Sequence, residues 1–276
     1  MELTWKLLVV VALLSLISAP AAAQSLNGLD IAKKTKAALE PDAPSTRVLK
    51  IDINQAAKRT AEWTGAQARA VENGAHCMVT VVLSPVQAKG MAVLARQNDN
   101  QAEQIWTYVP TLGRTVMLSP ANAFAPLFGS DFTFEDLGFV DLHNKYEYLG
   151  TATVESTPVY KVQEIPSNNP YYSKIIAWIR KSDFLPIHRD FYNYAGALVQ
   201  KEQYSGIQKI DGIPTVTKIK MTLESSGNST EFDFSNIQFN RKVPANLFNP
   251  DRLRTLAAEP FWNQSRVESH SGKAHS

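Results

Sequence analysis

The stretch TRVLKIDIN (residues 46–54) alternates apolar and polar side chains with a period of two. One side of an extended chain would present Leu49, Ile51 and Ile53, and the other side would present Lys50. Side chains that alternate in this way are typical of a β-strand with one face in the core and one face in solvent. The sequence around this stretch therefore predicts a β-sheet protein.

Similar runs follow along most of the chain, separated by residues that favour turns. Tight connections between consecutive runs are typical of an antiparallel meander. We count roughly eleven to thirteen strands in this way, which predicts a large antiparallel sheet with few helices. Apart from 46–54, the predicted strands span 59–74, 75–85, 87–97, 103–110, 114–119, 145–153, 157–166, 173–182, 185–194, 197–207, 213–225 and 229–240.

Two segments predict helices. Residues 25–41 form an amphipathic pattern that starts with Asp30 as a candidate N-cap and ends at Pro41. Residues 119–138 begin with Ser119 and Pro120, a typical cap and first helical position. We expect one short helix there to about Phe128 and a second one capped by Asp131. Several strands are apolar on both faces, so these two helical segments are expected to cover the sheet.

The N-terminus has the three parts of a secretory signal peptide. Lys6 precedes the apolar run LLVVVALLSLISA (7–19), which the small residues AAAQ (21–24) follow. The apolar run is shorter than the ~20 residues that span a bilayer, so we expect cleavage before Gln24 rather than a membrane anchor. The prediction is a periplasmic protein from which residues 1–23 have been removed.

Composition excludes a fold that depends on internal disulfides. Cys77 is the only cysteine in the 276 residues, and it lies in an apolar run, so we expect it to be a small buried hydrophobe. The formal net charge of +2 is too small to favour a nucleic-acid partner. Without disulfides the chain must form a large core, so residues 24–254 are predicted to be a single domain. The polar, aperiodic residues 255–276 are predicted to be disordered.

The segment GSDFTFEDLG (129–138) places three carboxylates and two phenylalanines in ten residues. An acid–base pair would need two carboxylates in different environments across a substrate, and the last two acids here are adjacent. A calcium site would need converging oxygen ligands, but the EF-hand order is absent. The third hypothesis is structural: Asp131 caps a helix, and Phe132 and Phe134 close the mouth of the sheet. We favour this structural interpretation.

Motifs of catalysis are absent from the rest of the sequence. There is no G-x-S-x-G, C-x-x-C or H-E-x-x-H pattern and no glycine-rich phosphate loop. His76 and Cys77 are neighbours in a predicted strand, so their side chains point to opposite faces. The sequence therefore predicts a protein that is not an enzyme, with no cofactor and no metal site.

Three segments together resemble a known family. They are WTYVPTLGRTVML (106–118), FGSDFTFEDLG (128–138) and AWIRKSDFLPIHRDFYNYAGALVQKEQY (177–204). The order and spacing of these segments resemble those of the outer-membrane lipoprotein-sorting protein family, the LolA-like periplasmic carriers, in its longer branch. The resemblance covers about residues 26–255. The resemblance implies an incomplete antiparallel β-barrel of about eleven strands, covered by an N-terminal helix and a central helical lid.

The resemblance also implies a function. A carrier of this kind holds the acyl chains of a lipid or lipoprotein in an apolar cavity, and in this branch an exporter of the inner membrane is an expected partner. The alternative is a subunit that docks on a resistance-nodulation-division type transporter and carries no lipid. The lid phenylalanines either compete with the ligand or cap a filled core, and both interpretations stay open. The predicted lipid-binding and lid residues are Trp106, Tyr108, Phe124, Leu127, Phe128, Phe132, Phe134, Ile176 and Trp178.

Overall fold

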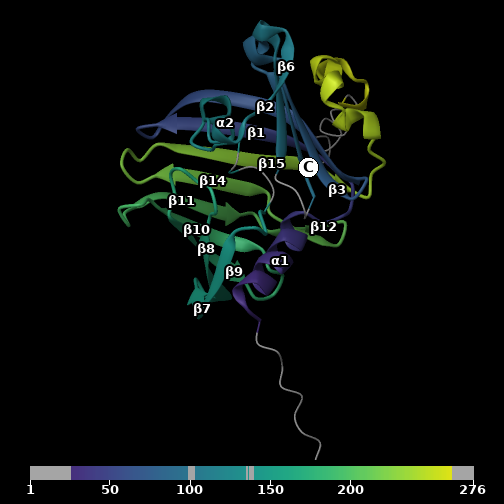
Figure 1. Cartoon of the computed structure of the whole chain (residues 1–276). Coiled ribbons are helices and arrows are strands. Elements are labelled where there is room, and N and C mark those ends of the chain that lie inside the picture. The colour runs from purple at the N-terminus through teal and green to yellow at the C-terminus, as the bar shows by residue number, and fades with distance from the viewer. Residues whose placement is uncertain (1–25, 99–102, 135, 137–139, 263–276) are drawn as a thin grey trace, which may run out of the picture.

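The computed structural model describes residues 26–98, 103–134, 136 and 140–262. Within these residues, thirteen strands form one antiparallel sheet in the order β6-β5-β4-β3-β2-β1-β15-β14-β11-β10-β9-β8-β7 (Figure 1). The strands are β1 (Ser45–Gln55), β2 (Lys58–Glu72), β3 (Ala75–Ser84), β4 (Ala92–Gln97), β5 (Gln104–Val109), β6 (Arg114–Met117), β7 (Lys145–Val154), β8 (Thr157–Ile165), β9 (Lys174–Arg180), β10 (Pro186–Tyr192), β11 (Leu198–Ser205), β14 (Lys218–Leu223) and β15 (Ser229–Phe239). A separate hairpin joins β12 (Gln208–Ile210) to β13 (Ile213–Thr215).

The alternation that opens the sequence analysis is confirmed in β1, which lies between β2 and β15 in the middle of the sheet. Leu49, Ile51 and Ile53 are only 3%, 1% and 6% exposed. On the opposite face, Lys50 and Asp52 form an ion pair at 3.1 Å. The prediction of a mainly β protein built on a large open antiparallel sheet is confirmed. In the described part of the chain this sheet has thirteen strands, which lies within the range counted from the sequence and exceeds the eleven or so that the resemblance implies.

The sheet is curved and open, because β6 and β7 stand at opposite ends of the strand order. The chain between these two edges packs on the concave side, where Leu127 and Phe132 join a core cluster with Phe232 of β15. The rings of Phe132 and Phe232 meet edge to face at 4.9 Å between centroids. The connection between the two edge strands is therefore packed against the middle of the sheet.

Helix α1 (Gly28–Leu39) covers the concave side near β7 and β8 (Figure 1). Ile31 is fully buried against Val162 and Ile179 of β8 and β9. A Cβ at position 28 would lie 2.6 Å from the Tyr146 carbonyl, so only glycine allows this close approach. The predicted helix is confirmed, but its N-cap is Asn27 rather than Asp30. Asp30 is instead the third helical residue of a capping box.

The central segment, for which the sequence predicts helices over residues 119–138, is less helical than predicted. Ser119 does cap a helix, but α2 (Pro120–Ala123) ends five residues before Phe128. The short 3₁₀ turn η3 (Leu127–Gly129) follows. No helix begins at Asp131, whose side chain accepts a hydrogen bond from the Thr230 hydroxyl at 2.8 Å. Tertiary contact with β15 therefore replaces the predicted cap. The predicted roles of residues 135 and 137 lie outside the described part of the chain.

The outer face of β3–β6 is covered by the C-terminal segment. This segment contains the 3₁₀ turns η4 (Ala245–Phe248) and η5 (Pro250–Ala258). Two other 3₁₀ turns belong to the sheet connections: η1 (Val86–Ala88) follows β3, and η2 (Pro110–Leu112) follows β5. Leu256 and Trp262 are buried in one cluster with Cys77 and Leu94. The prediction of disorder from residue 255 is therefore wrong for residues 255–262. An apolar outer face needs cover, and these residues supply it.

Among the described residues, none of the helices has both the length and the hydropathy to cross a bilayer. The predicted signal peptide, residues 1–23, lies outside the described part of the chain, as do residues 263–276.

Candidate ligand-binding cavity

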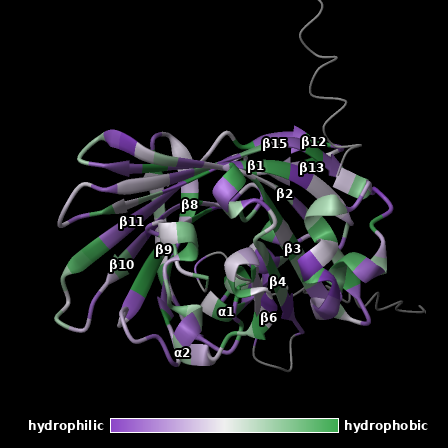
Figure 2. Cartoon of the chain, turned by 90° about the horizontal axis from the view of Figure 1, so that it is seen from above, coloured by the Kyte–Doolittle hydropathy of each residue, from purple (hydrophilic) through white to green (hydrophobic). Residues whose placement is uncertain are grey.

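A cavity of about 810 Å³ lies on the concave side of the sheet. Its size is within the usual range of small-molecule sites in proteins. In Figure 2 the strands β8–β11 and the strands β2–β4 lie on opposite sides of the molecule, with α1 between them. The apolar part of the lining comes from the sheet and from the central segment, and includes Leu49, Ile51, Val93, Ile105, Phe128, Phe134, Ile175, Ile219, Phe232 and Phe234.

The central segment contributes four of the predicted residues to the lining: Phe124, Leu127, Phe128 and Phe134. The ring of Phe128 stacks on Trp63 of β2, with 5.1 Å between the ring centroids. Aromatic rings at this distance attract each other beyond simple burial. The central segment therefore lies directly against the sheet at this point.

The other five predicted residues do not line the cavity. Trp106 and Tyr108 pack on the outer face of β5, in the cluster that the C-terminal segment covers. Trp178 contacts His188 at 4.4 Å between rings, and Ile176 is buried on the same strand face. Phe132 is fully buried in the core cluster that also contains Leu49 and Phe232.

A shift of one residue explains the error on β5 and β9. The cavity is lined by Ile105 rather than Trp106, and by Ile175 and Ala177 rather than Ile176 and Trp178. Successive side chains of a strand point to opposite faces, so an uncertainty of one residue moves the whole set to the other side. Both faces of these strands are apolar, so alternation could not distinguish them.

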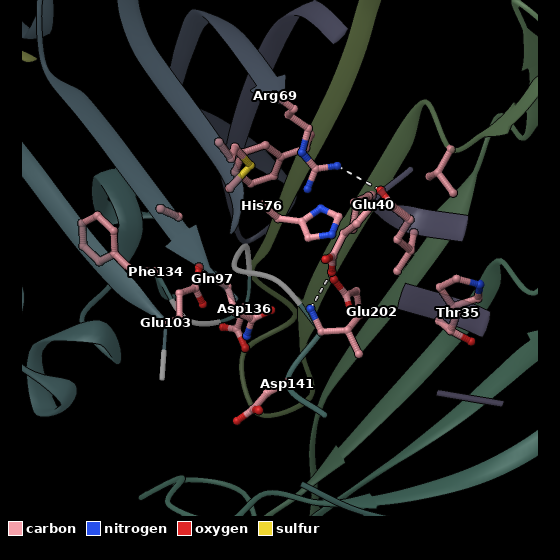
Figure 3. Close-up of a pocket in the computed structure, with 18 of the residues that line it drawn as sticks. Thr35, Glu40, Arg69, His76, Gln97, Glu103, Phe134, Asp136, Asp141 and Glu202 are labelled. Carbon is pink, nitrogen blue, oxygen red and sulfur yellow. Dashed lines mark hydrogen bonds between the residues drawn. The ribbon is translucent and has the colours of Figure 1, made fainter. Parts of the chain in front are cut away.

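One end of the cavity is polar, which the sequence analysis did not anticipate (Figure 3). Arg69, His76, Gln97 and Glu103 all line it. Next to them, the Lys36 ammonium group donates hydrogen bonds to Glu40 at 2.9 Å and to Gln97 at 2.6 Å. Glu40 in turn accepts a hydrogen bond from the Val140 N–H at 2.7 Å. The C-terminal end of α1 is thus held against the sheet and the central segment by polar contacts.

A second charged cluster lies on β8, β10 and β11. Arg189 donates to Glu202 at 3.1 Å and to Glu164 at 3.3 Å, and the Tyr204 hydroxyl donates to Glu202 at 2.8 Å. Burial raises the pKa of the Glu202 carboxyl above its ordinary value. Because Arg189 has two carboxylate partners and Glu202 has two donors, this cluster is satisfied internally and has the character of a structural ion-pair network.

The acids of segment 129–138 that the structure describes have local structural partners. Asp136 accepts hydrogen bonds from the N–H and the hydroxyl of Thr133, both at 2.8 Å. Asp131 is bonded to Thr230. In the described ranges, no group of three or more His, Cys, Asp or Glu side chains is placed to hold a metal ion. Among the described acids of this segment, Asp136 holds the backbone at Thr133, whereas the Asp131 carboxylate bonds to a side chain of β15.

Comparison with solved structures places the fold. A domain from Vibrio parahaemolyticus described as an outer membrane lipoprotein-sorting protein is 25% identical, with a TM-score of 0.76 over 82% of this chain and 98% of that chain. A DUF1329 family protein from Desulfovibrio piger is 23% identical, with a TM-score of 0.76 over 82% and 97%. A LolA superfamily protein from Nitrosomonas europaea is 17% identical, with a TM-score of 0.65 over 82% and 99%.

Sequence comparison identifies a family for the chain. The search of curated proteins finds no match. A family model with the description "Uncharacterized protein" matches residues 74–255, more than half of the chain. The matched part begins just before β3 and ends within η5, so it includes the whole central segment, all of the second charged cluster and part of the first. The chain belongs to this family of uncharacterized proteins, and its fold is that of the LolA-like lipoprotein-sorting proteins.

Proposed function

We propose that the protein is a periplasmic carrier that holds the acyl chain of a lipid or lipoprotein in the cavity of about 810 Å³. The cavity supports the proposal most directly, because it is large enough for a ligand and its inner part is lined by aliphatic and aromatic side chains. The likeness to a domain described as a lipoprotein-sorting protein points in the same direction.

The physical basis is the transfer of a chain from water to this lining. Each buried methylene contributes roughly 0.8 kcal/mol, so about ten of them contribute on the order of 8 kcal/mol. Release then requires a competing contact for the cavity wall. The central segment offers one, because Phe128 already stacks on Trp63 and Phe134 lines the same space. A carrier can thus exchange contacts with the ligand for contacts with its own side chains.

Lipid extraction tests this proposal. We expect the chain, purified from a periplasmic extract without detergent, to release acyl lipids that mass spectrometry identifies. In the variant Phe128→Asp the amount should fall at least about tenfold, because a carboxylate in an apolar lining is costly to desolvate. Phe128 has a φ of 53°, a region that aspartate tolerates better than most residues, so the backbone is not further strained.

Val86→Asp is the matched control, because Val86 is 83% exposed in η1 and does not line the cavity. Circular dichroism should show the same fold for both variants. Wild-type protein free of lipid, or equal lipid in wild type and Phe128→Asp, would contradict the carrier function. If the wild-type protein were free of lipid, a subunit that docks on an exporter would be the better hypothesis.

A further inference from the structure

Arg47 is a cation that faces the cavity from the middle of the sheet. It lies on β1, and alternation puts it on the same face as Leu49 and Ile51, which also line the cavity. Its guanidinium carbon lies 4.1 Å from the centre of the Phe234 ring on β15. The side chain is thus held at the boundary between the polar and the apolar parts of the lining.

Hydrogen bonds fix the direction of this guanidinium group. Its Nε–H donates to the Gln67 side-chain oxygen at 2.6 Å. The amide nitrogen of Gln67 donates to the Thr80 hydroxyl at 2.8 Å, which determines the orientation of the amide. Gln67 and Thr80 are only 6% and 9% exposed and both line the cavity. Arg47 lines the cavity, and its bond to Gln67 uses only its Nε–H, so the N–H groups of its two terminal nitrogens can serve a ligand.

Among the described residues, Arg47 has no carboxylate partner of the kind that Lys36 and Arg189 have. Lys36 is paired with Glu40, and Arg189 with Glu202. In the part of the chain that the structure describes, no carboxylate lies within ion-pair distance of Arg47. Burial, and then the positive charge of Arg69, lower the pKa of Arg47 below its ordinary value. A desolvated cation without a counter-ion is unfavourable, and an anion in the cavity would relieve this cost.

The neighbouring residues make the lining amphipathic along one direction. From Ser45 through Arg47 the cavity-facing side of β1 is polar, and from Leu49 to Ile51 it is apolar. Four residues of strand span about 13 Å, which is enough to separate a head group from the middle of an acyl chain. Arg69 of β2, paired directly with Ser45 in the sheet, adds a second cation to the polar end.

We propose that Arg47 binds the carboxylate or phosphate group of an anionic amphiphile, whose hydrocarbon chain lies along Leu49, Ile51 and Phe232. This inference rests on the proposed carrier function and names the chemical class of its ligand. A planar guanidinium can offer two parallel N–H groups to one carboxylate or phosphate, a geometry that a lysine cannot reproduce. Two acids lie at the same end: Glu40 is paired with Lys36 at 2.9 Å, and the charge of Glu103 acts on Arg69.

Isothermal titration calorimetry on the purified, delipidated chain tests the inference. The probes are dodecanoate, dodecyl phosphate and dodecanol, which share a twelve-carbon chain, and inorganic phosphate, which has none. We expect both anionic amphiphiles to bind about tenfold to a hundredfold more tightly than dodecanol, as charge-assisted hydrogen bonds predict. In Arg47→Gln this preference should disappear while dodecanol binding is unchanged. Arg47→Lys should retain only part of the preference.

Arg59→Gln is the matched control, because Arg59 lies on the same sheet but is exposed and paired with Asp52 on the outer face. Equal affinities of the wild type for dodecanoate and dodecanol would overturn the anion site and leave the carrier function standing. A preference that survives in Arg47→Gln would also overturn it. Inorganic phosphate that binds as tightly as dodecyl phosphate would show a site for a free anion instead. Absence of binding by all three amphiphiles would contradict the carrier function itself. The wild-type comparison decides the question even if Arg47→Gln does not fold.

Discussion

Asp131 connects the central segment to the middle of the sheet through Thr230 of β15 and Gln200 of β11. Its N–H donates to the Thr230 hydroxyl at 3.0 Å, and that hydroxyl donates to the Asp131 carboxylate at 2.8 Å. Thr230 is fully buried in β15. Burial raises the pKa of Asp131 above its ordinary value, and the hydrogen bond from Thr230 opposes part of this shift.

This shift predicts a pH dependence of stability. In the window between the ordinary aspartate pKa of about 3.9 and the raised value, the folded state retains a proton that the unfolded state has released. The free energy of unfolding should therefore fall as the pH rises through this window. In Asp131→Asn the fall should be smaller, as urea unfolding between pH 3.5 and 7 would measure. Glu155→Gln, in an exposed turn, is the control, and an unchanged pH profile of Asp131→Asn would refute the assignment.

At the scale of elements, the C-terminal segment completes the core on the outer face of the sheet. The Trp262 indole N–H donates to the Leu256 carbonyl at 2.7 Å, which anchors the end of η5. Beneath it, Cys77 is only 1% exposed. Burial raises the pKa of the Cys77 thiol, so little of the reactive thiolate is present.

Cys77 can therefore report whether this segment is in place. In Trp262→Ala we expect the thiol to react at least about tenfold faster with a disulfide reagent at pH 8. Removal of a buried tryptophan side chain typically costs about 3–5 kcal/mol, enough to increase local detachment of the segment. Arg254→Ala, at an exposed position of η5, should react at the wild-type rate. Equal labelling rates in wild type and Trp262→Ala would show that the segment does not protect Cys77.

At the scale of the whole molecule, the open sheet implies unequal stability from its middle to its edges. β1 is paired along its length with β2 on one side and β15 on the other. β6 and β7 each have a partner strand on one side only. Edge strands open more readily than central ones because fewer hydrogen bonds and contacts must break.

Hydrogen exchange can measure this difference. We expect the amides of β1 and β15 to exchange at least about a hundredfold more slowly than those of β6 and β7. Addition of dodecanoate should slow exchange in the central segment as well, since a ligand that binds only the folded state stabilises it. The outer-face residues of β9 provide an internal control that the ligand should not affect. Uniform protection across the thirteen strands would indicate that the edges are covered in solution.

Prediction from the sequence succeeded where one face of a strand is polar. Leu49 and Ile51 were assigned to the core because Lys50 separates them. It failed where both faces are apolar, as on β5 and β9, because Ile105 and Trp106 are equally suited to either face. For Arg47 the alternation did contain information, because Arg47, Leu49 and Ile51 are spaced two residues apart and so lie on the same face of the strand. Alternation alone does not say whether an inward-facing arginine meets water, a carboxylate or a cavity.

The sequence by itself determined that this chain forms a large antiparallel sheet with a helix at its start, because local alternation and breaking residues specify strands and their connections. It also determined the family, through three segments in a common order. Only the tertiary structure decided that η5 covers the outer face, that Asp131 bonds to Thr230, and that Arg47 faces a cavity with its Nε–H bonded to Gln67. These features depend on residues far apart in the chain, and the curvature of the sheet, which brings them together, is not encoded in any single segment.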